Sequence, residues 1–140
     1  MQTLWAVHLA AAAAMTGVLW VVQCAVYPLF GSVGERHFAA YHQRYTARVS
    51  LVVLPLMGVE MLTGLALAWS GWSEAGPGFQ VAFGLLVFVW VSTFLVQMPL
   101  HRRLAEQYAP ELQRRLVATN WVRTVAWTAR VVLLFSLPPT

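Results

Sequence analysis

The chain has 140 residues, of which 59% are hydrophobic and 10% are charged, so it is long enough for one domain and too apolar for an ordinary soluble one. Its nine basic residues are all Arg and its five acidic residues are all Glu, which gives a net charge of +4. These arginines stand beside apolar runs and do not form a basic face with interleaved aromatics. The composition therefore indicates a protein embedded in a lipid bilayer, with no nucleic-acid partner.

Four apolar runs divide the chain, each close to the ~20 residues that cross a hydrocarbon core as a helix. They cover residues 4–27, 49–69, 79–98 and 118–137. Only helices and closed barrels satisfy the backbone inside a bilayer, and the runs lack the strict alternation of barrel strands. We therefore expect an all-α, four-transmembrane-helix bundle that forms a single membrane domain over residues 1–140.

The connections between the runs differ in length and charge. The second, residues 70–78, is short and rich in glycine, and Glu74 is its one charged residue. The first and third are longer and contain most of the arginines. By the positive-inside rule these two connections face the cytoplasm, so both termini face outward. The expected location is the inner (cytoplasmic) membrane of a bacterium.

Helix signals continue into both basic connections, so we expect helical extensions on the cytoplasmic side. Aromatic residues at helical spacing predict that the second helix begins near Glu35. Apolar residues at the same spacing continue the third helix as far as Tyr108, and Pro110 suits the first turn of the last helix. The pair Pro28-Leu29 after the first run and the pair Pro99-Leu100 after the third indicate a faint repeat of two similarly oriented hairpins.

Each run carries polar residues, although a charged side chain in hydrocarbon is penalised by roughly 2.5–3.5 kcal/mol on insertion scales. Spacings of three and four, or sums of these, put one face of each helix toward the bundle interior. The four sets are His8, Thr16, Gln23 and Tyr27; Arg48, Glu60 and Thr63; Thr93, Gln97 and His101; and Asn120, Arg123, Trp127 and Arg130.

Glu60 and Arg130 each lie about midway along their runs, and therefore at similar depth in the membrane. We expect them to pair, or to share a polar cavity, near Thr16. Two interpretations stay open. The pair is either a structural ion pair that fixes the packing of the second and fourth helices, or part of a site for a ligand or a proton relay.

A second polar layer is expected at the cytoplasmic ends of the helices. Its ligand-binding residues would be Gln23, His42, Arg48, Gln97 and Asn120. As an enzyme, the protein would use His101 or Glu60 as a general base and Arg123 or Arg130 to stabilise an oxyanion. His8, near the outer end, is interpreted as an interfacial residue, and Trp127 as a packing residue.

Histidine ligands raise the question of a cofactor, because imidazole suits zinc, copper and iron. A haem or metal at His42 and His101 is one option, since these residues could face each other from different helices. His37 and His42 are five residues apart, which on a helix points them about 140° away from each other. The spacing therefore assigns no metal ligands, and the cofactor is unknown.

Two short segments carry a resemblance to known membrane proteins. Pro99 and Leu104, followed by Asn120 and Arg123, are similar to the Pro-Thr-Asn-x-x-Leu and Asn-x-x-Arg segments of the anthrone oxygenase-like four-helix membrane proteins, with Leu100-His101 where Thr-Asn would stand. The Tyr-His-x-x-Tyr-x-x-Arg segment that begins at Tyr41 resembles one found in uncharacterised bacterial four-helix membrane proteins. The resemblance implies a small polar pocket on the cytoplasmic side for an aromatic or quinone-like compound.

Three functions fit these residues. The first is a small-molecule pocket within the bundle, with oxidoreductase-like chemistry as one option. The second is an accessory or structural subunit of a larger membrane complex, or a homo-oligomer, in which the polar residues fix helix packing. The third is a dimeric proton-coupled transporter that uses Glu60, against which Arg130 argues because an ion-paired carboxylate is a poor proton carrier. Both catalytic and non-catalytic roles remain open.

Overall fold

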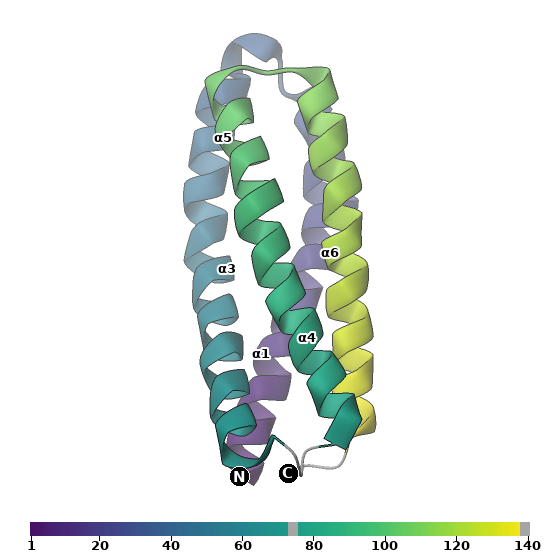
Figure 1. Cartoon of the computed structure of the whole chain (residues 1–140). Helices are drawn as coiled ribbons and strands as arrows, with labels where there is room; N and C mark the ends of the chain where they lie inside the picture. The colour runs from purple at the N-terminus through teal and green to yellow at the C-terminus, as the bar shows by residue number, and fades with distance from the viewer. Residues whose placement is uncertain (73–75, 138–140) are drawn as a thin grey trace.

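The computed structural model describes residues 1–72 and 76–137, and the regular structure within these residues is entirely helical. The helices run side by side along one long axis (Figure 1). Short helical segments join end to end, so that the chain forms four rods. The first rod is α1 (Gln2–Val21), η1 (Val22–Val26), α2 (Tyr27–Leu29) and η2 (Phe30–Ser32); the second is α3 (Glu35–Gly71); the third is α4 (Gly76–Ser92), η3 (Thr93–Gln97) and α5 (Met98–Glu106); and the fourth is α6 (Pro110–Ser136).

Three of the rods are long and apolar enough to cross a membrane, which indicates an integral membrane protein. They are Gln2–Ser32, Glu35–Gly71 and Gly76–Glu106. α6 has 27 residues but is not among these three. Its sequence is more polar, because Asn120, Arg123 and Arg130 lie within it.

Most of the predicted helix ends agree with the structure. The second helix begins at Glu35 and the last at Pro110, as the sequence predicts. The prediction that the third helix reaches Tyr108 is wrong, since α5 ends at Glu106. Ala109 is extended, as a residue before proline prefers to be, and the chain leaves the helix just before it. Glu74 and residues 138–140 lie outside the described part of the chain.

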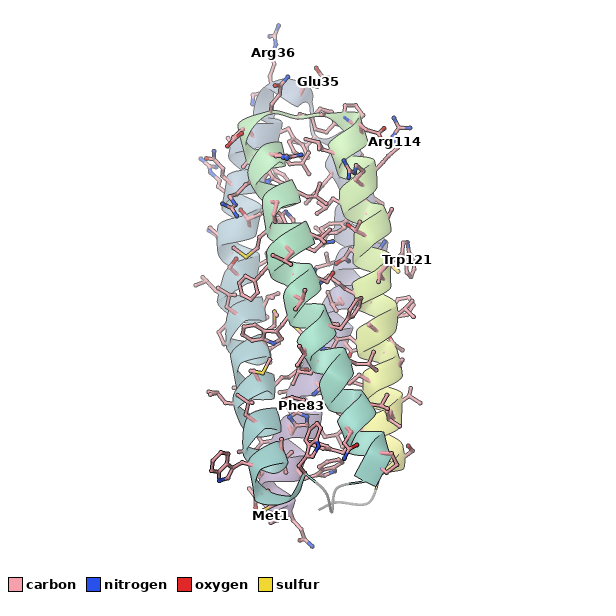
Figure 2. The ribbon with its side chains drawn as sticks, viewed as in Figure 1. Met1, Glu35, Arg36, Phe83, Arg114 and Trp121 are labelled. Carbon is pink, nitrogen blue, oxygen red and sulfur yellow. The ribbon has the colours of Figure 1, made fainter. Side chains whose placement is uncertain are left out.

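The two ends of the molecule differ in charge. The start of α1 and the end of α6 lie at the same end as the end of α3 and the start of α4 (Figure 1). Glu35, Arg36 and Arg114 lie near the opposite end from Met1 (Figure 2). We call the end that carries Arg36 and Arg114 the basic end.

Three buried apolar clusters follow one another along the axis. The cluster near the basic end is Val22, Tyr27, Phe30, Phe38, Leu100, Leu104 and Leu116; the central cluster is Met15, Leu19, Met57, Leu86, Val89, Ala126 and Trp127; and the third is Trp5, Ala12, Leu67, Phe79, Ala82 and Leu134. Large apolar side chains also cover the outside, and Trp69 is 95% exposed. An exterior this apolar suits lipid and not water.

Proline widens two of the rods at matching positions. A proline lacks an N–H group, and its ring clashes with the carbonyl four residues earlier. Before Pro28 the helix takes one wide π turn, in which the Tyr27 N–H donates to the Val22 carbonyl. Before Pro99 the Met98 N–H donates to the Thr93 carbonyl in the same way. The repeat suggested by the two Pro-Leu pairs therefore extends to the backbone around them.

Candidate functional site

Buried polar side chains line the interior of the molecule, as the polar spacing predicts. All four rods contribute to the set, which is His8, Gln23, His42, Glu60, Thr93, Gln97, Asn120, Arg123, Thr124 and Arg130. Buried polar groups need hydrogen-bond partners. Their contacts divide them into an ion-pair layer in the half away from the basic end, a cavity, and a histidine pair near the basic end.

The ion-pair layer joins α3 to α6. Arg130 Nη1 lies 3.4 Å from Glu60 Oε1, and both side chains are almost completely buried. The expected pairing of these two residues is therefore present. The indole Nε1 of Trp127 also donates to both carboxylate oxygens of Glu60, at 3.2 and 3.0 Å. The carboxylate is satisfied from two sides, and Trp127 does more than pack.

His8 extends this layer to α1. Arg130 Nη2 donates to His8 Nε2 at 2.7 Å, and His8 Nδ1 lies 2.8 Å from the Thr63 hydroxyl. An arginine can only donate, so Nε2 is the acceptor and the neutral ring carries its hydrogen on Nδ1. Interpreting His8 as an interfacial residue was wrong, because it is only 2% exposed. The signal for this was its helical spacing from the buried residues Ala12, Met15 and Leu19.

Glycine at position 64 lets α3 approach the His8 ring. A Cβ atom there would lie 3.1 Å from His8 Cε1 and 3.1 Å from Leu86 Cδ2. We expect Gly64→Ala to lower the free energy of unfolding by about 1–3 kcal/mol, because the packed neighbours must move. Gly58→Ala on the same helix is the control, since nothing lies within 4 Å of its Cβ position. It should raise stability by about 0.5–1 kcal/mol. Detergent-induced unfolding followed by tryptophan fluorescence measures both, and equal effects would contradict the packing role.

A cavity of about 160 Å³ lies between the ion-pair layer and the basic end. Its apolar wall comes mainly from α1 and α3, and includes Met15, Val18, Leu19, Val22, Val49, Val53 and Leu54. Its polar lining is Tyr27, Tyr45, Ser50, Thr93, His101, Asn120 and Arg123. Leu54 is 54% exposed, so the cavity reaches the outer surface of α3.

Both wide π turns border this cavity. Val22 and Tyr27, whose backbone groups close the first turn, line it, and so do Thr93 and Met98, which close the second. Wide turns of this kind occur frequently at functional sites. The two proline-associated distortions of the helices therefore coincide with a cavity in which polar groups from all four rods surround open space.

Arg123 is fixed in the cavity wall by a chain of amides. Its Nη1 donates to Asn120 Oδ1 at 2.9 Å, and Asn120 Nδ2 donates to Gln23 Oε1 at 2.7 Å. The guanidinium also lies 5.4 Å from the centre of the Trp127 ring, within the range of a cation–π interaction. Within residues 1–72 and 76–137, no carboxylate lies at ion-pair distance from Arg123. A guanidinium has five N–H donors, so Arg123 has donors and a charge to offer an occupant.

The histidine pair adjoins the cavity through His101. The Tyr27 hydroxyl lies 3.1 Å from His101 Nε2, and His42 Nε2 lies 3.0 Å from His101 Nδ1. Two proton arrangements fit these contacts. In one, Tyr27 donates to His101, and the His42 N–H is buried without a partner. In the other, His42 donates to His101 and His101 donates to Tyr27. The second arrangement leaves His42 Nδ1 unpaired as an acceptor. It also frees the Tyr27 O–H to donate into the cavity.

No known protein family, curated protein or solved structure matches this chain. The likeness to the anthrone oxygenase-like proteins stays an expectation. The function is therefore inferred from the cavity and the groups around it.

The histidines do not fit a haem held between them. A haem iron would need one axial nitrogen on each side of it, whereas His42 Nε2 and His101 Nδ1 face each other in hydrogen-bond contact at 3.0 Å, which leaves no room for an iron between them. His37, the other candidate ligand, is exposed. In the described part of the chain, no group of three or more His, Cys, Asp or Glu residues is placed to hold a metal ion.

The structure separates the residues that the sequence grouped into one site. His101, Asn120 and Arg123 line the cavity, and His42 and Gln23 hydrogen-bond to them from behind. The remaining four predicted residues lie elsewhere. Gln97 donates to Thr119, Glu60 and Arg130 form the ion-pair layer, and Arg48 lies on an exposed face of α3.

Arg48 lies outside the cavity for a geometric reason. The residues of α3 that line the cavity include Tyr45, Val49 and Val53, which recur every four residues. All the lining residues of α3 lie on one side of the helix, and at about 100° per residue Arg48 lies on the side that faces away from the cavity. The prediction that Arg48 faces the bundle interior is therefore wrong.

The sequence did not assign Tyr45 or the apolar wall to the site. Tyr45 belongs to the Tyr-His-x-x-Tyr-x-x-Arg segment, so the sequence singles it out, but nothing in the sequence indicates that it lines a cavity. Residues such as Met15 and Val53 have no distinguishing signal, because an apolar residue that lines a cavity looks the same in sequence as one that fills a core.

Proposed function

We propose that this protein binds one small, membrane-soluble molecule in the cavity beside Arg123, and that the molecule is an aromatic ring carrying an acceptor oxygen, such as a quinone or a phenolate. The size of the cavity supports one ring. An apolar cavity of about 150 Å³ can hold benzene, and this cavity measures about 160 Å³. A longer apolar tail would leave beside Leu54 toward lipid.

The observation that carries the proposal is Arg123, a buried arginine that lines an apolar cavity and pairs with no carboxylate among the described residues. Burying an uncompensated charge is costly. A ligand with an anionic or strongly accepting oxygen would offset that cost and would receive a charge-assisted hydrogen bond. The apolar residues of α1 and α3 would hold the ring itself.

The histidine pair gives the site a means to exchange protons. Tyr27 and His101 line the cavity, and His101 contacts His42, which lies toward the basic end. A proton could pass between the oxygen of a bound ligand and His42 by way of Tyr27 and His101. His101 would act as the general base, and Arg123 would stabilise the charge on the ligand oxygen.

The proposal includes α6 as a fourth transmembrane helix. Its polar residues Asn120, Arg123 and Arg130 are buried, and its exposed side chains between residues 121 and 135 are all apolar. The exposed apolar side chains include Trp121, Val122, Val125, Val132 and Phe135, and Trp121 points away from the other rods in Figure 2. A helix with this distribution meets lipid with an apolar surface despite its polar sequence.

The basic end would face the cytoplasm and both termini would face outward, in the inner membrane of a bacterium. Labelling with a membrane-impermeant maleimide tests this orientation in a Cys24→Ala background. Gln2→Cys should react in intact cells, and Arg36→Cys should react only after the membrane is opened. The reverse pattern would refute the orientation.

A cavity-filling substitution tests the binding function. The protein, extracted gently from its own membrane, should carry one discrete additional organic mass in a native mass spectrum. Val53→Phe should abolish that mass, because the phenylalanine ring would fill the space that the ligand ring needs. Val52→Phe is the matched control, since Val52 is 49% exposed on the outside of α3, and it should keep the ligand. Absence of any added mass from the unmodified protein would contradict the proposal, and signal only within a much heavier assembly would favour an accessory subunit.

The contacts of Glu60 favour a structural role over proton-coupled transport. Its carboxylate is fully buried and is held by Trp127 and Arg130 together. A carrier must release and regain its proton during each cycle, whereas the Arg130 charge and the Trp127 hydrogen bond both oppose protonation of this carboxylate.

A further inference from the structure

A groove of about 530 Å³ runs over the outer face of α3 near the basic end. It is lined by Tyr41, Arg44, Tyr45, Arg48 and Val49. These residues recur at spacings of three and four, so they form one stripe along the helix. Arg48, which lies outside the cavity, belongs to this second feature.

The two arginines of the groove lack charge partners. Arg44 and Arg48 are exposed, and within residues 1–72 and 76–137 neither forms an ion pair. Like charges four residues apart on one helix face repel each other. Two guanidiniums with two tyrosine side chains beside them form a surface complementary to an anion with several oxygens.

The depth of the groove points to the headgroup region of a bilayer. Just beyond Arg48, the outer face of α3 becomes apolar, with Leu51 77% exposed and Leu54 54% exposed. Three residues of helix cover only ~4.5 Å. The guanidiniums therefore lie directly beside the surface that would contact acyl chains, with the tyrosines at the level where aromatic residues gather.

We propose that this groove binds the anionic headgroup of one phospholipid, whose phosphate contacts Arg44 and Arg48 while its acyl chains follow Leu51 and Leu54. Arginine matches phosphate with paired N–H donors. The continuous apolar surface below the arginines favours a lipid over a free phosphate ion. The inference depends on α3 crossing the membrane and is independent of what the cavity binds. Tyr45 and Val49 line both the groove and the cavity, so the lipid would lie against the outside of the cavity wall.

Native mass spectrometry of the delipidated protein, titrated with phosphatidylglycerol or phosphatidylcholine, tests the site. One phosphatidylglycerol should bind at least about tenfold more tightly than phosphatidylcholine. The Arg44→Gln/Arg48→Gln variant should lose about tenfold in affinity for phosphatidylglycerol. The matched control is Arg36→Gln/Arg102→Gln, which removes the same charge from two exposed arginines outside the groove and should bind like the unmodified protein.

Three results would overturn the proposal. Equal affinity for the two lipids would exclude recognition of the anionic headgroup. An equal loss in the Arg36 and Arg102 control would show that net charge alone attracts the lipid. Displacement of phosphatidylglycerol by inorganic phosphate would identify a free anion as the ligand. The Arg44→Lys/Arg48→Lys variant should retain part of the affinity, since lysine keeps the charge but loses the paired donors.

Discussion

Replacing Arg130 with Met is expected to lower the free energy of unfolding by about 3–5 kcal/mol, because the substitution leaves the Glu60 carboxylate buried without its charge partner. The pair is inaccessible to solvent, with 1% and 0% of the two side chains exposed, so water cannot compensate for the loss. Arg130 also donates to His8 and to the Ala82 carbonyl. One substitution therefore removes contacts between α6 and each of the other three rods.

The double variant Glu60→Leu/Arg130→Met separates the charge penalty from the loss of packing. Replacing both members of a buried ion pair with apolar residues is often close to neutral. We expect the double variant to be more stable than Arg130→Met alone, with a residual loss of about 1–3 kcal/mol from the unpaired Trp127 N–H and His8. Glu111→Gln is the control, since its ion pair with Arg114 is exposed and should contribute little.

Unfolding in mixed micelles, followed by tryptophan fluorescence, measures these variants together. The cycle also includes the single variant Glu60→Leu. Additive effects of Glu60→Leu and Arg130→Met would contradict a charge-coupled pair, because coupled residues deviate from additivity. Retention of the cavity ligand by a folded Glu60→Gln variant would support the structural interpretation of the pair. Its loss would connect the ion-pair layer to the cavity through Trp127, which contacts both Glu60 and Arg123.

Much of the helical structure could be predicted from the sequence, because length and hydropathy determine a membrane helix more directly than a soluble one. Local signals also placed the starts of α3 at Glu35 and α6 at Pro110. The inward faces followed from polar spacing, since a buried polar stripe on one helix requires partners on another. For Glu60 and Arg130, matching depth was enough to identify the pair.

The parts that could not be predicted depend on how the helices rotate about their own axes. Gly64 leaves room for the His8 ring beside α3, and a glycine in an apolar run carries no sign of this contact. Arg48 lies outside the cavity because the rotation of α3 turns its side chain away from the lining residues. The sequence shows the prolines at positions 28 and 99, but it does not predict that the helix before each proline widens by one residue into a π turn. Residues of both turns line the cavity.

Replacing Arg123 with Gln is expected to weaken the binding of a benzoquinone carrying one isoprenoid unit by about tenfold to a hundredfold. A hydrogen bond to a charged group contributes about 1.5–3 kcal/mol, and each 1.4 kcal/mol corresponds to a factor of ten. Gln retains an amide donor in a side chain that is two atoms shorter, so the variant removes the charge and the paired guanidinium donors. Isothermal titration in detergent measures the affinity, and Arg114→Gln, at an exposed site, should bind like the unmodified protein.

The comparison with Val53→Phe makes this test specific to Arg123. If the quinone oxygen accepts from the guanidinium, Arg123→Gln and Val53→Phe should both weaken binding, one by removing a donor and the other by filling the space. Arg123→Lys should bind more weakly than the unmodified protein but better than Arg123→Gln, because lysine keeps the charge and loses the planar donors that Asn120 orients. Unchanged affinity in Arg123→Gln, with affinity lost in Val53→Phe, would mean that the ring enters the cavity with its oxygen directed elsewhere. The Tyr27 and His101 side of the cavity would then be the polar contact.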